Sequence, residues 1–313
     1  MSLLGATDCR SAGQPGKFPE WAYPPCIRAA SAAPLDNVLP LHVPGSRARF
    51  TASDVANTAV APDWFPREHS PLPADLAAGR PGKFACAYCH LPDGSGRPEN
   101  AKLAGLSRSY IFAQVRALHV GERQPAKAGW PPTVLMQGAV AELTDTQILA
   151  AADYFSQQKN VSFVRVLERE FAPAHKVACG TYVPDAGHLV LLKQRIVEMP
   201  IEASRFEARD PHTEYIAYVP KGSIERGRRL ASTGDNGRTQ PCAACHGADL
   251  RSSPDLEGPA LAGRFATYLF RQLFGFQSDA RTGDMTLPMR AVVAHLTQAD
   301  MIDLAAYAAS MKP

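Results

Sequence analysis

Two copies of the pattern C-x-x-C-H constrain this chain of 313 residues more than any other feature. The first copy reads CAYCH at residues 86–90, and the second reads CAACH at residues 242–246. This pattern is the attachment signature of a c-type haem. Two thiols on one helical turn can each bond a vinyl group of the same porphyrin, and the adjacent imidazole can then reach the iron. We therefore expect two covalently bound haem c groups. The residues expected to hold them are Cys86, Cys89, His90, Cys242, Cys245 and His246.

Two other uses of paired cysteines fit the sequence less well. A structural zinc site needs four ligands in a closed arrangement, and no second nearby C-x-x-C or H-x-H pattern supplies them. A thioredoxin-like redox pair lies beside a β-α-β pattern, and none is recognisable around either motif. Haem attachment therefore remains the prediction.

The residues that follow the two motifs repeat one another. Each copy has Leu-Ala-Gly, a Tyr five residues after the Gly, a Gln four residues later, and an Arg nine residues after that. A Met then stands seven residues before a Leu-Thr pair. The matching residues are Tyr110 and Tyr268, Gln114 and Gln272, Arg123 and Arg281, and Met136 and Met289. The repeat predicts two copies of one helical domain.

Start signals place helices inside each copy. Ser107 is a candidate N-cap, Thr144 and Gln147 form a candidate capping box, and Thr297 holds the matching position in the second copy. Apolar residues follow at helical spacing. They are Ile111, Val115 and Leu118; Ile148, Ala152 and Phe155; and Met301, Leu304, Ala308 and Met311. Domains of about 80 residues have small cores, so covalently held haem would supply much of the apolar mass.

These features together resemble the two-domain, two-haem class I cytochromes c of the cytochrome c4 type. The resemblance covers about residues 76–158 and 222–313, which we expect to be cytochrome c domains 1 and 2. It implies an all-α fold of two class I cytochrome c domains in tandem, and an electron-transfer role. It also implies that Met136 and Met289 are the distal axial ligands of the two irons.

Ligation by Met and His suits an electron carrier, because a soft thioether favours Fe(II) and raises the reduction potential. A single Met is more often a packing residue, but two at the same offset favour ligation. Met285 is the rival of Met289 in the second copy. The methionines expected to pack in cores are Met199, Met301 and Met311.

The other repeated polar residues are expected to contact haem propionates or to line the face between the domains, with ordinary surface positions as the alternative. They are Tyr110, Gln114, Arg123, Tyr268, Gln272 and Arg281, and Trp130 is a further candidate for propionate contact. Members of the family often have a Pro whose carbonyl accepts a hydrogen bond from the proximal imidazole. Pro259 fits this role in the second copy, whereas Ala101 takes the position in the first.

Three cysteines stand outside the haem motifs. Cys9 and Cys26 are candidates for a disulfide, and Cys179 is expected to be a buried or free thiol. The alternative for Cys179 is a thiolate that replaces a Met on one iron, as in some thiosulfate-oxidising two-haem cytochromes.

Two regions lie outside the predicted domains. Residues 1–75 hold 11 of the 27 prolines, so we expect a loop-rich, extended arm. Residues 159–221 form a connector with minor β content, in which residues 188–199 and 214–219 have strand-like apolar character. We expect these regions to strap the two domains together, with docking of a partner as the alternative.

The net charge and the hydropathy of the chain limit the classes of partner that the sequence predicts. The net charge of +3 gives no reason to propose nucleic acid, and no run of about 18 apolar residues predicts a membrane-spanning helix. The expected partners are a protein electron donor and a protein electron acceptor, with docking to a membrane complex left open. Covalent haem attachment implies a periplasmic location, although residues 1–20 show no convincing signal peptide.

The sequence thus favours a dihaem carrier of single electrons in a respiratory chain, with no catalytic residues. One alternative is a dihaem enzyme of the peroxidase or thiosulfate dehydrogenase type, which needs an open or displaceable position on one iron. The other is a fixed electron-transfer subunit of a respiratory or dehydrogenase complex.

Overall fold

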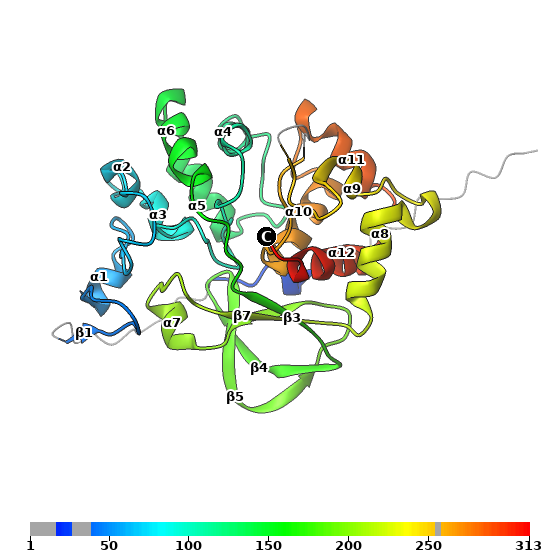
Figure 1. The fold of residues 1–313 in the computed structure, drawn as a ribbon, viewed down its shortest axis with the longest axis horizontal. Coiled ribbons are helices and arrows are strands. Elements are labelled where there is room, and N and C mark those ends of the chain that lie inside the picture. Colours follow the sequence, from blue (N-terminus) through cyan, green and yellow to red (C-terminus); the bar gives the residue numbers. More distant parts are fainter. Residues whose placement is uncertain (1–16, 27–38, 254–257) are drawn as a thin grey trace, which may run out of the picture.

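The computed structural model describes residues 17–26, 39–253 and 258–313. Most helices gather in two groups, and strands lie below both groups in the view of Figure 1. The first helical group contains α2 (Ala74–Ala77), α3 (Cys86–His90), α4 (Arg108–His119), α5 (Pro131–Val140) and α6 (Asp145–Ser156). The second helical group contains α8 (Ser223–Gly237), α9 (Ala243–His246), α10 (Ala266–Gln277), α11 (Leu287–Val293) and α12 (Gln298–Ser310). A short 3₁₀ turn, Asp284–Thr286, precedes α11.

The helix starts follow the expected caps. The Ser107 hydroxyl accepts a hydrogen bond from the Tyr110 amide at the start of α4. Thr144 and Gln147 form a reciprocal capping box at α6, and Thr297 forms another with Asp300 at α12. Each cap satisfies amides that the first helical turn leaves without an intrahelical partner. The repeat therefore appears in space as a matching order of elements: a motif helix, a second helix, a Met-bearing helix and a final helix.

The connector has more β structure than the sequence indicated, so all-α is an incomplete description of the chain. It contains β3 (Val164–Glu168), β4 (Phe171–Ala178), β5 (Thr181–Leu191), β6 (Val197–Pro200) and β7 (Tyr215–Val219). Strand β7 pairs in parallel with β3 and antiparallel with β6, while β4 and β5 form a separate antiparallel hairpin. The short helix α7 (Ala203–Glu207) separates β6 from β7.

The expected strand at residues 214–219 is present as β7, but the one at 188–199 is divided. Its first residues end β5 and its last residues begin β6, with a break between them at residues 192–196. Strands β3 and β4 had not been predicted. Their short apolar runs acquire strand structure from tertiary pairing, and local pattern alone does not reveal such partners.

The described part of the N-terminal arm is loop-rich, as expected, with a few short elements. They are a 3₁₀ turn (Glu20–Ala22), β1 (Pro40–Leu41), β2 (Phe50–Thr51) and α1 (Ala52–Ala56). Trp64 is buried in a small core with Val43 and Val55, and its indole N–H donates to the Ala208 carbonyl at 2.7 Å. This contact packs the arm against the connector just after α7, and α1 and α7 both lie at the lower left of Figure 1.

The connector also holds the second helical group. Glu198 of β6 is fully buried, and its carboxylate accepts hydrogen bonds from the Ala266 and Thr267 amides at 2.9 and 3.0 Å. A strand of the connector therefore caps the N-terminus of α10. Within the described ranges, no helix combines the length and the apolar character needed to cross a membrane.

Candidate haem sites

The first motif forms the short helix α3. His90 is buried, and its Nδ1 lies 2.8 Å from the Ala101 carbonyl oxygen. Because that carbonyl can only accept, Nδ1 carries a proton and Nε2 is left with its lone pair for a metal. Burial lowers the pKa of His90 and the bond to Ala101 opposes the shift, so the neutral imidazole that metals bind is favoured. Ala101 therefore supplies the backbone carbonyl in the first copy, although the resemblance had led us to expect a Pro there.

The second motif lies on α9 and repeats this arrangement. His246 is buried, and its Nδ1 lies 2.7 Å from the Pro259 carbonyl oxygen. Burial lowers the pKa of His246 as well. A Cβ atom on Gly258 would lie 2.6 Å from His246 Nδ1, so the residue beside this imidazole needs to lack a side chain. Both predicted proximal residues thus have the same oriented imidazole.

The four motif cysteines form no disulfide. Cys86, Cys89 and Cys242 are half-buried and Cys245 is exposed. Burial raises the pKa of Cys86 and of Cys242 to about 11. Their sulfur atoms are therefore placed in apolar surroundings, which suits a thioether better than a thiolate.

A large cavity opens beside α3. Its empty volume is about 1570 Å³, open mouth included. Cys86, Cys89 and His90 line it from α3, and Met136 lines it from α5. The cavity fits a porphyrin, because it joins both thiols, the imidazole and a thioether around one mainly apolar space.

The two expected distal methionines lie on corresponding helices. Met136 of α5 lines the cavity of His90, and Met289 of α11 is half-buried against the same apolar core as Cys242. Met285, the rival, is 86% exposed. Met199 and Met301 are buried packing residues, as the sequence predicted.

The repeated polar residues meet between the two helical groups. Arg123 and Arg281 pair through their backbones in an isolated β-bridge. The Gln114 Oε1 atom accepts from Arg123 at 3.0 Å and from Arg281 at 2.5 Å. The Gln272 Oε1 atom accepts from the same two residues at 2.8 and 3.1 Å. This near-symmetric cluster, which we call the arginine pair, places the repeat residues on the face between the two groups.

Tyrosines of the repeat extend the arginine pair. The Tyr268 hydroxyl accepts from Arg123 at 3.3 Å, and both Tyr110 and Tyr268 line the first cavity. In the described part of the chain, neither Arg123 nor Arg281 forms an ion pair with a carboxylate. Burial lowers the pKa of Arg281, and the neighbouring Arg123 lowers it further. Buried cations of this kind need an anion, and haem propionates would provide one.

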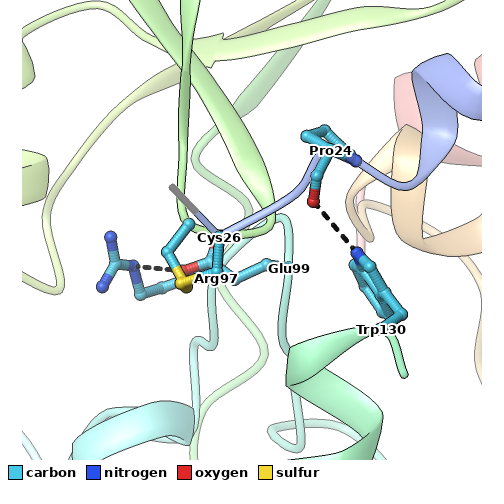
Figure 2. Close-up of a disulfide and its surroundings, with 6 residues drawn as sticks. Pro24, Cys26, Arg97, Glu99 and Trp130 are labelled. Carbon is cyan, nitrogen blue, oxygen red and sulfur yellow. Dashed lines mark hydrogen bonds and ion pairs between the residues drawn. A yellow bond between two sulfur atoms is a disulfide. The ribbon is translucent and has the colours of Figure 1, made fainter. Parts of the chain in front are cut away.

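Trp130 lines the same cavity, but its indole N–H donates to the Pro24 carbonyl at 3.1 Å. Figure 2 shows this bond beside the disulfide. The one hydrogen-bond donor of the Trp130 side chain is therefore used by the arm. Any contact of Trp130 with a haem would come from its ring.

The disulfide prediction was wrong in its partner. Cys26 bonds to Cys179, across a sequence separation of 153 residues, and Cys9 lies outside the described residues. Spacing along the chain favoured the nearer cysteine, whereas the fold brings the turn between β4 and β5 to the arm. This bond also shows that the expected free thiol at Cys179 was wrong, and it rules out Cys179 as a thiolate ligand of iron.

The side chains of the cavity wall that were not predicted include Tyr23, Glu99 and Arg271. Tyr23 belongs to the Pro-aromatic stretch Trp21–Pro25, whose composition indicated only an extended segment. Arg271 stands next to the predicted Gln272 on α10, but it has no counterpart in the repeat, because the corresponding residue of the first copy is Ala113.

Comparison with known proteins adds an independent line of evidence. A family model described as cytochrome c matches residues 224–312. Cytochrome c4 of Pseudomonas aeruginosa is 41% identical over 236 residues, which cover 74% of this chain and 87% of that protein. The thiosulfate dehydrogenase electron acceptor of Thiomonas intermedia is 27% identical over 230 residues, covering 72% of this chain and 78% of that protein.

Among solved structures, reduced recombinant cytochrome c4 from Pseudomonas stutzeri aligns with a TM-score of 0.48 and 24% identity, over 72% of this chain and 93% of that chain. The sequence identity with the Pseudomonas aeruginosa protein, sustained over most of its length, decides the relationship. With its two C-x-x-C-H motifs, this chain belongs to the cytochrome c4 family, the electron-transfer cytochromes c that carry two covalently bound haem c groups.

Proposed function

We propose that this chain carries electrons one at a time in the periplasm, from a dehydrogenase or quinol-oxidising complex to a terminal acceptor. We further propose that residues 76–158 and 222–313 are its two haem domains. The observation that carries the proposal is the repeated proximal arrangement. His90 and His246 are both buried, and each has its Nδ1 held by a backbone carbonyl.

The iron of each haem supplies the one-electron chemistry, and the protein sets its surroundings. In this proposal His90 and Met136 hold one iron, and His246 and Met289 hold the other. Cys86, together with Cys89, Cys242 and Cys245, forms the thioethers. With His and Met both bound, each iron would have no position free for a substrate, which favours a carrier over a peroxidase.

The arginine pair lies between the two halves of the proposed carrier. We propose that Arg123 and Arg281 neutralise propionates, with Gln114 and Gln272 fixing the two guanidinium groups. Support comes from the burial of Arg281 and the half-buried position of Arg123, from the absence of a carboxylate partner among the described residues, and from the position of both in the wall of the first cavity. Propionates of both haems would then face the same small polar region.

A second candidate is an electron acceptor dedicated to one sulfur-oxidising enzyme. It is favoured by the similarity to a protein named as a thiosulfate dehydrogenase electron acceptor. In that case the arm and the connector would serve as the docking surface of a complex, rather than only as a strap.

Three assays on the purified holoprotein separate these functions. Peroxide consumption by the reduced protein tests the enzyme alternative, and we expect none beyond simple reoxidation. Thiosulfate alone is expected to leave both haems oxidised, whereas thiosulfate with a thiosulfate dehydrogenase reduces them if the second candidate is correct. Reduction by a quinol-oxidising membrane fraction, together with no response to thiosulfate and enzyme, supports the general carrier. Sustained turnover of peroxide would contradict both proposals.

A further inference from the structure

We propose that residues 17–26 form a lid on the first haem cavity, and that the Tyr23 hydroxyl donates a hydrogen bond to a propionate of the haem attached at α3. This inference rests on the proposed function, because it requires haem at Cys86, Cys89 and His90. It assigns a role to a segment that lies outside both predicted haem domains. We call residues 17–26 the lid.

The lid contacts both helical groups. On the side of the second group, the ring centroids of Trp21 and Phe270 are 4.5 Å apart. The Arg271 guanidinium of the same helix donates to the Ala22 carbonyl at 3.1 Å. On the side of the first group, the Tyr23 ring packs edge-to-face on Trp130 at 5.3 Å. The lid therefore bridges the seam between the two groups next to the cavity.

A covalent bond fixes the end of the lid. The disulfide of Cys26 joins it to Cys179, in the turn between β4 and β5 (Figure 2). The next residue, Gly180, has φ = +81°, and a Cβ there would lie 2.9 Å from side-chain atoms of both Glu99 and Pro132. Because both of these residues line the cavity, the anchor of the lid rests directly on the cavity wall.

Tyr23 presents a polar atom that lacks a partner. Its side chain is 2% exposed and lines the cavity. Its hydroxyl makes no hydrogen bond to any residue that the structure describes. Burial raises the pKa of Tyr23, so the group stays a phenol and remains a donor. A buried hydroxyl without a partner carries a desolvation penalty, which an anionic acceptor in the cavity would remove.

The neighbouring charges favour an anion beside Tyr23. Arg271 is buried, and its guanidinium donates to two neutral carbonyls, those of Ala22 and Pro98. Glu99 also has an oxygen without a hydrogen-bond partner, but that carboxylate lies 3.1 Å from the Arg97 Nε atom. A propionate is an acceptor, so it matches the hydroxyl of Tyr23 and the charge of Arg271 rather than the carboxylate of Glu99.

The lid should therefore raise the reduction potential of the first haem. A propionate charge near the iron favours Fe(III), and a hydrogen bond from Tyr23 disperses part of that charge. Exclusion of water from the cavity acts in the same direction, because a low dielectric disfavours the more highly charged oxidised centre. The Tyr23 hydroxyl belongs to the first cavity, so the potential of the second haem should respond little to its loss.

The direct test is potentiometric titration of the Tyr23→Phe holoprotein. This change keeps the ring that packs on Trp130 and removes only the hydroxyl. We expect the potential of the first haem to fall and that of the second to stay unchanged. The Met136→His variant assigns the step that belongs to the first haem. Tyr218→Phe, a change in β7 outside the cavity wall, is the matched control. Equal shifts of both haems, or no shift, would overturn the role of Tyr23.

A second variant tests the lid itself. In Cys26→Ser/Cys179→Ser we expect faster amide hydrogen exchange in residues 17–26, and a fall of the first haem's potential in the same direction as in Tyr23→Phe. Faster exchange with an unchanged potential would overturn the lid, and unchanged exchange would overturn the anchor. Near-infrared absorption of each variant is recorded first. If the unmodified protein itself lacked a methionine-to-iron charge-transfer band, that result would count against the proposed function and not against the lid.

Discussion

The proximal imidazoles illustrate how single residues set this site. His90 and His246 lie on different elements, yet each Nδ1 is held by a backbone carbonyl further along the chain, that of Ala101 (11 residues on) and that of Pro259 (13 residues on). The side chain of the accepting residue is irrelevant to the bond, because only its backbone takes part. The departure from Pro to Ala in the first copy therefore leaves the orientation of the imidazole intact.

At the residue scale, Met136→Ala should lower the potential of one haem, because water or an empty position replaces a ligand that favours Fe(II). The fall in reduction potential is measured by potentiometric titration of the purified holoprotein. Met285→Ala serves as the matched control, since that side chain is 86% exposed. Met136→Ala with two unchanged potentials would be incompatible with the proposed ligation.

A second residue, His69 of the arm, predicts a pH dependence. Its Nε2 lies 3.1 Å from an Asp63 oxygen, and its Nδ1 lies 2.8 Å from the Ser70 carbonyl. Both oxygens are acceptors, and the Tyr154 hydroxyl, 3.1 Å from Nδ1, donates to the Pro92 carbonyl and can also accept, so the imidazolium form fits best. The bond to Asp63 raises the pKa of His69. A folded-state pKa above the ordinary value means stabilisation that is fully present below about pH 6.5 and is lost as the pH rises through the folded-state pKa.

Hydrogen exchange of residues 39–77 checks this prediction. The wild-type arm should exchange more slowly than that of His69→Gln at pH 6, and the difference should shrink as the pH rises. His188→Gln, at an exposed position of β5, is the control. A protection difference that stays constant across this pH range would contradict the role of the imidazolium.

At the element scale, the connector is a structural part of the second helical group. Replacing Glu198 by Ala leaves the amides of Ala266 and Thr267 buried without acceptors. Each unsatisfied group costs about 1–3 kcal/mol, so we expect a loss of about 2–4 kcal/mol in unfolding free energy after partial relaxation. Chemical denaturation of the holoprotein measures it, with the exposed Glu214→Ala as control. A loss equal to that of the control would show that β6 does not stabilise α10.

The elements that the sequence predicted are those with local signals. Ser107, Thr144 and Thr297 each mark a helix start through a bond to a residue three positions away, so the signal is readable along the chain. The repeat made the pairing of Arg123 with Arg281 foreseeable as an interdomain face, although not as a hydrogen-bonded cluster.

The elements that escaped prediction depend on distant partners. Strand β3 exists because β7, some fifty residues later, pairs with it in parallel. The disulfide joins Cys26 to a hairpin turn 153 residues away. Tyr23 became a cavity residue only because that turn and Trp130 hold the arm in place. No local pattern encodes such contacts. Composition could therefore indicate an extended arm, but not the surface against which the arm packs.

At the scale of the whole molecule, the disulfide links the two ends of a loop that contains the entire first helical group. The chain-entropy relation gives an upper bound of about 5 kcal/mol for a loop of this length. We therefore expect Cys26→Ser/Cys179→Ser to lower the denaturation midpoint of the holoprotein clearly. The comparison is with wild-type protein in the same denaturant, without reductant. An unchanged midpoint would mean that the arm contributes little to global stability.

The arginine pair couples the two helical groups directly. Gln114 belongs to the first group and Gln272 to the second, and each accepts from both Arg123 and Arg281. The repeat thus yields one shared cluster rather than two separate sites. This arrangement supports the proposal that the two haems lie on either side of the arginine pair.

The central claim is that both irons are ligated by His and Met, and near-infrared absorption of the oxidised holoprotein tests it most directly. The methionine-to-Fe(III) charge-transfer band, quantified per haem, counts the Met-ligated irons. We predict two per molecule, from Met136 and Met289. One or none would mean an open or differently ligated iron, and would contradict the account of this chain as a simple electron carrier.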